Sequence, residues 1–259
     1  MTALLVDIGN TRIKWARLAG NEIAEQSAAV HANWTSDDFI QQILGSGPRM
    51  ERVFIANVSG KRMADVAQAA LAGAWQIEPR FVHSPAQQAG IRNAYPEPAK
   101  LGVDRWLAML GGRAFEPRPL CVVSVGTAMT IDGLDASGQH LGGVIVPGPE
   151  LMVSSLLKNT SDIAQRAAGG RAGDELFADN TLGAIQQGAV QALAALVDRA
   201  LETMRKRLGE PPVLLLTGGA SGQIQGAIHS PGREIPDLVL RGLAVVAAQP
   251  DAAAPDPRT

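Results

Sequence analysis

Residues 7–14 place a carboxylate, a glycine, a hydroxyl and an amine within eight positions, in the order Asp-Ile-Gly-Asn-Thr-Arg-Ile-Lys. Asp7 lies near the end of an apolar run, so its carboxylate is expected at the end of a buried strand, where it can hold a hydrated Mg²⁺. Gly9 lets backbone amides approach an anion, while Thr11 and Lys14 add a donor and a positive charge. This combination suits a polyphosphate, although Asn and Gly also favour an ordinary hairpin turn.

Two later segments have related chemistry. Residues 124–130, Ser-Val-Gly-Thr-Ala-Met-Thr, form a second glycine-containing turn between two expected strands. Residues 216–221, Leu-Thr-Gly-Gly-Ala-Ser, place a Gly pair between an expected strand and a helix start. Such a pair can admit an adenosine or can simply allow close helix–strand packing. Residues 216–221 do not fit the Walker A or G-x-G-x-x-G pattern, which disfavours P-loop and Rossmann folds.

A fourth segment, residues 93–106, reads Asn-Ala-Tyr-Pro-Glu-Pro-Ala-Lys-Leu-Gly-Val-Asp-Arg-Trp. Asp104 and Arg105 fall near the start of a helix expected over 101–115, where the helix dipole favours an ionised carboxylate. Beside a phosphate site, such a carboxylate could take the proton of an acceptor hydroxyl. The alternative is that Asp104 caps the helix and pairs with a neighbouring arginine.

Composition excludes several other classes of function. The 259 residues carry 23 Lys and Arg against 25 Asp and Glu, so no basic excess indicates nucleic acid or an anionic membrane. One cysteine and four scattered histidines offer neither a disulfide framework nor metal-ligand spacing. We find no signal peptide and no apolar run of membrane-spanning length, so a cytoplasmic protein is expected.

The elements that must position these groups occur twice. Strands are expected over 3–9, 12–18 and 22–30, and again over 120–126, 130–134 and 141–147. Ser36 is expected to cap a helix over 37–44, and residues 182–200 carry the stripe of an amphipathic helix. We therefore predict an α/β fold of two domains with mixed sheets, over 1–117 and 118–248, followed by a disordered tail over 249–259.

The three glycine-containing loops, in this order, resemble the acetate and sugar kinase, Hsp70 and actin superfamily. Its two ribonuclease-H-like domains clamp ATP between two phosphate loops and an adenosine motif. Nearly the whole chain resembles the type III pantothenate kinase family, which includes the Bvg accessory factors. The further residues that carry this resemblance are Tyr95, the Gly-x-Asp-Arg-Trp run over 102–106 and the pair Asn180-Thr181.

This resemblance implies ATP-dependent phosphorylation of pantothenate, the first step of coenzyme A biosynthesis, by a homodimer. It assigns Asp104 as the general base that deprotonates the acceptor hydroxyl. It places Asp7 near the Mg²⁺ of Mg-ATP. The residues implied to bind ATP are Asp7, Ile8, Gly9, Asn10, Thr11, Arg12, Ile13, Lys14 and, from the second domain, Thr127. Those implied to bind pantothenate are Tyr95, Gly102, Val103, Asp104, Arg105 and Thr181.

One departure concerns Ser124, since family members commonly carry Asp there and use it to coordinate a monovalent cation, K⁺ or NH₄⁺. A serine has no charge, so we expect any cation requirement to be weaker or to be met by other ligands. Two alternatives stay open at this point: another small-molecule kinase of the superfamily, or a nucleotide-binding regulatory protein without turnover.

Overall fold

The computed structural model describes residues 2–45, 47–171, 173 and 175–249, which form two compact units. The first unit combines the chain up to residue 85 with residues 99–114 and the chain end from 239. The second unit combines residues 86–98 with 115–238. The sequence-based division into 1–117 and 118–248 differs in assigning 86–98 and 115–117 to the first half and 239–248 to the second. Of the tail predicted to be disordered, residues 250–259 lie outside the described residues.

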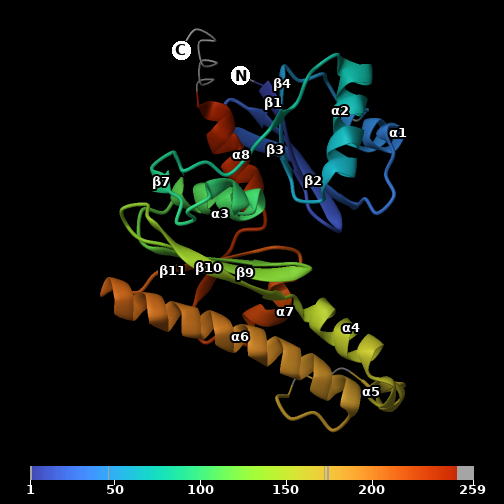
Figure 1. Ribbon diagram of the computed structural model, residues 1–259, viewed down its shortest axis with the longest axis vertical. Helices are drawn as coiled ribbons and strands as arrows, with labels where there is room; N and C mark the ends of the chain where they lie inside the picture. Colours follow the sequence, from blue (N-terminus) through green and yellow to red (C-terminus); the bar gives the residue numbers. More distant parts are fainter. Residues whose placement is uncertain (1, 46, 172, 174, 250–259) are drawn as a thin grey trace. The chain divides into compact units, whose positions relative to one another are not determined.

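The first unit is built on a five-stranded mixed sheet of order β3-β2-β1-β4-β5 (Figure 1). Its strands are β1 (Thr2–Ile8), β2 (Arg12–Ala19), β3 (Glu22–Val30), β4 (Arg52–Asn57) and β5 (Arg80–Phe81). The first three strands pair antiparallel, whereas β1–β4 and β4–β5 are parallel. The predicted hairpin and its third strand are confirmed.

Side chains of β1 alternate between the two faces of this sheet. Leu4, Val6 and Ile8 belong to a core that also contains residues of α1 (Ser36–Phe39) and α2 (Lys61–Trp75). Asp7 therefore points to the opposite face, which α3 (Val103–Arg113) and α8 (Leu238–Ala248) cover. These two helices pack closely: a Cβ at Gly242 would lie 2.0 Å from the carbonyl oxygen of Leu107.

The helix predicted over 37–44 differs from the prediction in its cap and its winding. Thr35, not Ser36, is the N-cap, and its side chain and that of Asp38 form a reciprocal capping box. After α1 the backbone widens into a π-helix over Ile40–Leu44. Adjacent Thr and Ser are both good N-caps, so the sequence pattern alone did not separate them.

The second unit repeats the same sheet order as β10-β9-β8-β11-β12. Its strands are β8 (Leu120–Val125), β9 (Ala128–Leu134), β10 (His140–Pro147), β11 (Val213–Thr217) and β12 (Gly232–Glu234). The long helix α6 (Thr181–Leu208) packs on one face, where Leu193 and Val197 meet Val123 and Met129 (Figure 1). The predicted duplication is confirmed at the level of strand order and pairing.

Shorter elements complete the second unit. They are β6 (Gln87–Gln88), β7 (Ile91–Arg92), α4 (Pro149–Asn159), α5 (Ser161–Ala167) and α7 (Ser221–Gln225). β6 and β7 form a small antiparallel ladder directly before Asn93. No helix in the part of the chain that the structure describes is long and apolar enough to cross a membrane.

Candidate active site

Asp7 lies one residue before the end of β1, directly across from Lys14 on β2. Burial raises the pKa of its carboxyl from 3.8 to about 7; the Lys14 ammonium opposes this shift and the negative charge of Asp104 adds to it. Burial disfavours the ionised carboxylate, as does a like charge nearby. Two carboxylates and one amine of the first unit are therefore electrostatically coupled, which is typical of a functional site.

The turn after Asp7 presents its backbone at the tip of the hairpin. The Gly9 amide donates to the Arg12 carbonyl at 3.0 Å, and a Cβ at Gly9 would lie equally close to that oxygen. Asn10, Thr11 and Arg12 are exposed, whereas Ile8 and Ile13 are buried in the core. Of the predicted ATP-binding residues, these two isoleucines can thus offer only backbone groups to a ligand.

A histidine that sequence reasoning missed supports this turn. His31 is buried, and its Nε2 donates to the Gly9 carbonyl at 2.6 Å, while its backbone amide donates to the Thr11 carbonyl at 3.3 Å. His31 directly follows β3, and nothing in its spacing connects it with residues 9–11. The pairing of β3 with β2 brings it under the turn.

Asp104 lies in the first turn of α3, whose N-cap is Gly102. A Cβ at Gly102 would lie 2.7 Å from Oδ1 of Asp104, so the glycine leaves the space that this carboxylate occupies. Arg105 and Val103 are buried beside it. The helix N-terminus favours the negative charge of Asp104. Gly102 and the start of α3 together surround the Asp104 carboxylate.

A cavity of about 370 Å³ lies in the first unit next to this helix start. Its lining includes residues of the Gly102 turn together with Asn57, Val58 and His83. Asn57 was not predicted as a site residue, although β4 runs parallel to β1 and ends at the same edge of the sheet. The carboxyl ends of parallel strands commonly line ligand sites, and that rule could have identified Asn57.

In the second unit, Ser124 takes the position that Asp7 has in the first. It lies one residue before the end of β8 and pairs with Thr130 on β9 and Thr217 on β11. These three neighbours supply hydroxyl oxygens and no carboxylate. Thr127 is exposed at the following turn, where its carbonyl accepts from the Gly148 amide at 2.8 Å.

The third glycine-containing loop packs directly against the second. Gly218 has a φ of +95°, and a Cβ there would lie 2.2 Å from the Val125 carbonyl oxygen. The Ala220 amide donates to that same oxygen at 3.0 Å. Gly218 is therefore required both by its backbone conformation and by this close approach.

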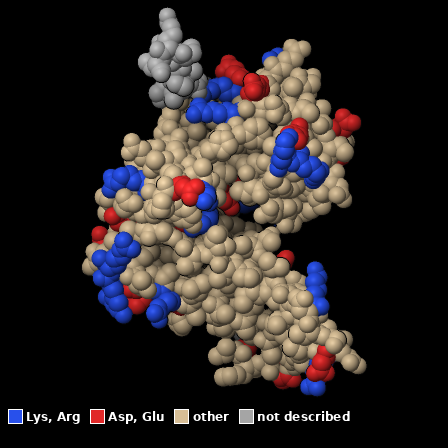
Figure 2. Space-filling view, viewed as in Figure 1, with Lys and Arg blue, Asp and Glu red and all other residues tan. Residues whose placement is uncertain are grey.

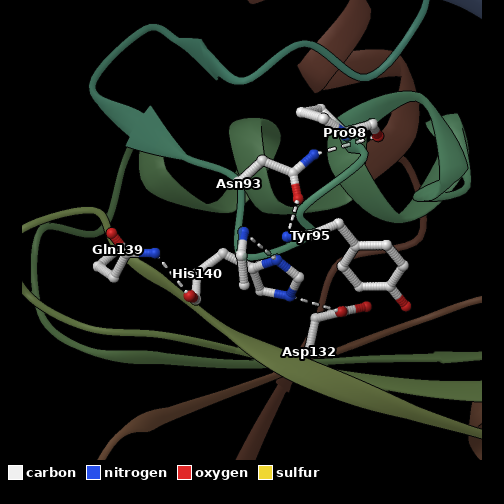
Figure 3. A network of polar contacts seen from close by, with 7 residues as sticks. Asn93, Tyr95, Pro98, Asp132, Gln139 and His140 are labelled. Carbon is white, nitrogen blue, oxygen red and sulfur yellow. Dashed lines mark hydrogen bonds and ion pairs between the residues drawn. The ribbon is translucent and has the colours of Figure 1, made fainter.

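Tyr95 and Thr181 also belong to the second unit. The Tyr95 amide donates to Oδ1 of Asn93, and its ring stacks on His140 (Figure 3). Thr181 begins α6 directly after Asn180, whose side chain caps the helix by accepting from the Gly183 amide at 2.9 Å. The structure thus brings Asp7, Lys14 and Asp104 together in one unit, and Tyr95, Ser124, Thr127 and Thr181 belong to the other.

On the face drawn in Figure 2, acidic and basic side chains occur in small mixed groups and form no large patch of one charge. Among the residues that the structure describes, no three His, Cys, Asp or Glu side chains gather into a metal-binding cluster. The candidate site instead rests on the electrostatic coupling of the Asp7 and Asp104 carboxylates.

Comparison with known proteins identifies the family. The family model described as type III pantothenate kinase matches residues 3–203. The type III pantothenate kinase of Aromatoleum aromaticum is 39% identical over 97% of this chain and 99% of its own length. That of Nitrosococcus oceani is 36% identical over 94% of this chain and 93% of its own.

Solved structures with lower identity show the fold. A putative Baf family transcriptional activator from Campylobacter jejuni has a TM-score of 0.57 and 22% identity, covering 94% of this chain and 97% of its own. Component A of the Acidaminococcus fermentans (R)-2-hydroxyglutaryl-CoA dehydratase has a TM-score of 0.56 and 15% identity, covering 95% and 96%. The predicted α/β class, with two ribonuclease-H-like sheets, is confirmed. Given the family match and the near-full-length relatives, this chain belongs to the type III pantothenate kinase family.

Proposed function

We propose that this chain transfers the γ-phosphate of ATP to the primary hydroxyl of pantothenate, with Asp104 as the general base. The observation that carries the proposal is the coupled pair of carboxylates, Asp7 at the end of β1 and Asp104 in the first turn of α3. Family membership supports the substrate.

The two carboxylates have different surroundings and so suit different tasks. Asp104 lies at a helix N-terminus, which stabilises its ionised form and keeps it able to accept a proton. As the base, it would take the proton of the pantothenate hydroxyl while that oxygen attacks the γ-phosphorus in line with the leaving ADP. Phosphoryl transfer depends mainly on positioning and charge stabilisation, so the remaining groups act by holding the two substrates.

ATP phosphates would contact the backbone amides of residues 9–12 and the Lys14 ammonium, and Thr127 would add a contact from the second unit. The buried Asp7 carboxylate fits a Mg²⁺ ion carried by ATP, because a cation there would relieve the repulsion between Asp7 and Asp104. Bound Mg²⁺ would supply neutralisation of the charge that develops on the phosphates.

Pantothenate would contact Tyr95, Gly102, Val103, Arg105 and Thr181. Arg105 suits the pantothenate carboxylate, since a guanidinium offers two parallel donors to a carboxylate. The cavity in the first unit is lined by Gly102 and Val103, which supports the assignment of these two residues.

The position of Ser124 bears on whether the enzyme uses a monovalent cation. Ser124 and its register neighbours Thr130 and Thr217 supply hydroxyls but no negative charge, so this set fits K⁺ or NH₄⁺ less well than a carboxylate would. We propose that turnover depends only weakly on such a cation.

A homodimer is also part of the proposal. In the second unit, apolar side chains are exposed on β10, on α4 and before α6: Val144, Ile145, Leu151, Leu156, Leu176 and Phe177. Phe177 is 89% exposed. Exposed apolar groups of this kind favour a protein partner, and we assign them to a second copy of the chain. We place this enzyme in the cytoplasm, where ATP is supplied.

An assay of the purified full chain tests the function. ADP release is measured with Mg-ATP and either pantothenate, a panel of sugars or acetate. Pantothenate-dependent ADP release is expected, with a matching phosphorylated product. Release with a sugar or acetate alone would indicate another kinase of the superfamily, and nucleotide binding without any release would indicate a regulatory protein.

A further inference from the structure

A buried histidine and aspartate lie beneath the segment that carries Tyr95. His140 begins β10 and Asp132 lies on β9; their side chains are 0% and 2% exposed. The distance between Nε2 of His140 and Oδ1 of Asp132 is 3.0 Å. Nδ1 of His140 accepts from the Ala94 amide at 3.4 Å, so Nε2 carries the proton and donates to Asp132. The aspartate thereby fixes both the tautomer and the ring orientation of His140.

The oriented imidazole ring supports Tyr95 directly. The two ring centroids are 6.2 Å apart and the ring planes differ by 12°, a stacked arrangement visible in Figure 3. Offset stacking at this separation is favourable for aromatic pairs. Asp132, His140 and Tyr95 thus form a chain of contacts from the middle of β9 to a phenol that is only half-buried.

Other contacts fasten the same segment to the turn between β9 and β10. The Arg92 amide donates to the Gly138 carbonyl at 2.9 Å, and the Arg92 side chain donates to Gln139 and Ser137. Gly138 has a φ of +84° and comes so close to the Gly90 carbonyl that a Cβ would not fit. These contacts hold the backbone of the segment, and the stacked ring of His140 contacts the Tyr95 side chain itself.

The protein contains a second histidine–aspartate pair that lacks this arrangement. Nδ1 of His229 and Oδ2 of Asp198 are 2.7 Å apart, but the His229 side chain is 92% exposed. Burying a polar pair has a desolvation cost, whereas an exposed pair has little. The exposed pair therefore provides a matched control for the buried one.

We propose that His140, oriented by Asp132, is a positioning residue that holds the Tyr95 ring for pantothenate binding. This inference rests on the proposed function in one respect, the assignment of Tyr95 to pantothenate. The contact between His140 and Tyr95 is independent of that assignment and can be measured without turnover.

Steady-state kinetics of the full chain separate this role from a general one. His140→Gln keeps a donor for Asp132 but removes the ring, so KM for pantothenate is expected to rise about 10-fold with kcat within about 2-fold. KM for ATP and all constants of the control His229→Gln are expected to stay unchanged. A fall in kcat accompanied by similar rises in KM for pantothenate and in KM for ATP would indicate a merely structural role and overturn the proposal.

A double-mutant cycle tests whether His140 acts through Tyr95. Tyr95→Leu removes the supported ring, so adding His140→Gln to it is expected to produce no further rise in KM for pantothenate. Additive effects of the two substitutions would contradict the proposal. Asp132→Ala is expected to follow His140→Gln, whereas Asp132→Asn keeps an acceptor and should stay near the wild type.

Because Tyr95 is the only tyrosine in the chain, 3-fluorotyrosine labelling gives a single ¹⁹F resonance from this site. In the wild type it is expected well away from its position in urea-denatured protein, and His140→Gln should shift it toward that position while His229→Gln should not. Coincidence of the native and denatured wild-type signals would overturn the proposal even if the variants failed to fold. A shifted wild-type signal with no response to pantothenate would instead count against the proposed function.

Discussion

The two units use one sheet design with different chemistry at the same position. In each, the first strand pairs antiparallel with the second and parallel with the fourth. The penultimate residue of that first strand is Asp7 in one sheet and Ser124 in the other. Across from them lie Lys14 and Thr130. A carboxylate and an amine in one unit thus correspond to two hydroxyls in the other.

A second comparison concerns how each unit treats a buried carboxylate. Burial and the nearby charge of Asp104 raise the pKa of Asp7 to about 7, although Lys14 opposes the shift. In the second unit, hydrogen bonds from Arg118, with further attraction to Arg233, lower the pKa of Glu116 to about 2. The Asp7 charge is left under-compensated, as expected where a cationic ligand arrives, whereas the Glu116 charge is neutralised by the fold itself.

The largest expected effect comes from the first unit. Asp104→Asn keeps the size of the side chain but cannot accept a proton, so kcat for pantothenate phosphorylation should fall about 10²-fold to 10⁴-fold. The fall is measured as pantothenate-dependent ADP release, with ATP binding as the control for folding. Activity within 10-fold of the wild type would reject Asp104 as the general base.

Replacing the glycines that follow β4 and β11 by alanine should lower the free energy of unfolding by different amounts. Gly218→Ala forces a Cβ against the Val125 backbone, and we expect a loss of about 3 kcal/mol or more in the free energy of unfolding. Gly60 has a φ of +88° with open space around it, so Gly60→Ala should cost about 1–3 kcal/mol from backbone strain alone. Denaturant unfolding compares them, and equal losses would show that the close approach has no energetic weight.

Glu116→Gln tests how much the ion pair between Glu116 and Arg118 stabilises the fold. The Glu116 side chain accepts from Nε and Nη2 of Arg118 at 2.9 and 2.8 Å, and losing the charge should destabilise the fold by about 1 kcal/mol at pH 7. Because the folded pKa lies below the unfolded value of 4.5, this stabilisation is present above about pH 4.5 and is lost as the pH falls toward 2. The difference between wild type and variant should therefore shrink in acid; a constant difference would contradict the assigned pKa.

The smallest effect is expected for monovalent cations. With Ser124 in place of a carboxylate, replacing Na⁺ by K⁺ or NH₄⁺ should change turnover less than about 3-fold, because hydroxyl oxygens alone bind such ions weakly. Ser124→Asp should increase the dependence. A sharp requirement for K⁺ at low millimolar concentration in the wild type would contradict this expectation.

Much of the fold could be predicted because local patterns agree with the tertiary structure. Alternating apolar residues and the turns at Gly9 and Gly126 predict both hairpins, and the stripe over 182–200 predicts α6. The contacts of His31 and His140 could not be predicted, since each depends on strand pairing that brings distant residues together. The coupling of Asp7 with Asp104 likewise requires α3 to lie on the face opposite α2, which periodicity alone does not specify.

The most direct test of the asymmetry between the two sheets makes the same substitution at the matching positions. Asp7→Ala and Ser124→Ala are compared with the wild type for kcat/KM in pantothenate-dependent ADP release. Removing the under-compensated carboxylate should reduce kcat/KM about 10²-fold or more, while removing the hydroxyl should change it less than about 3-fold. Similar losses in both variants would contradict the conclusion that the chemistry is carried by the first sheet.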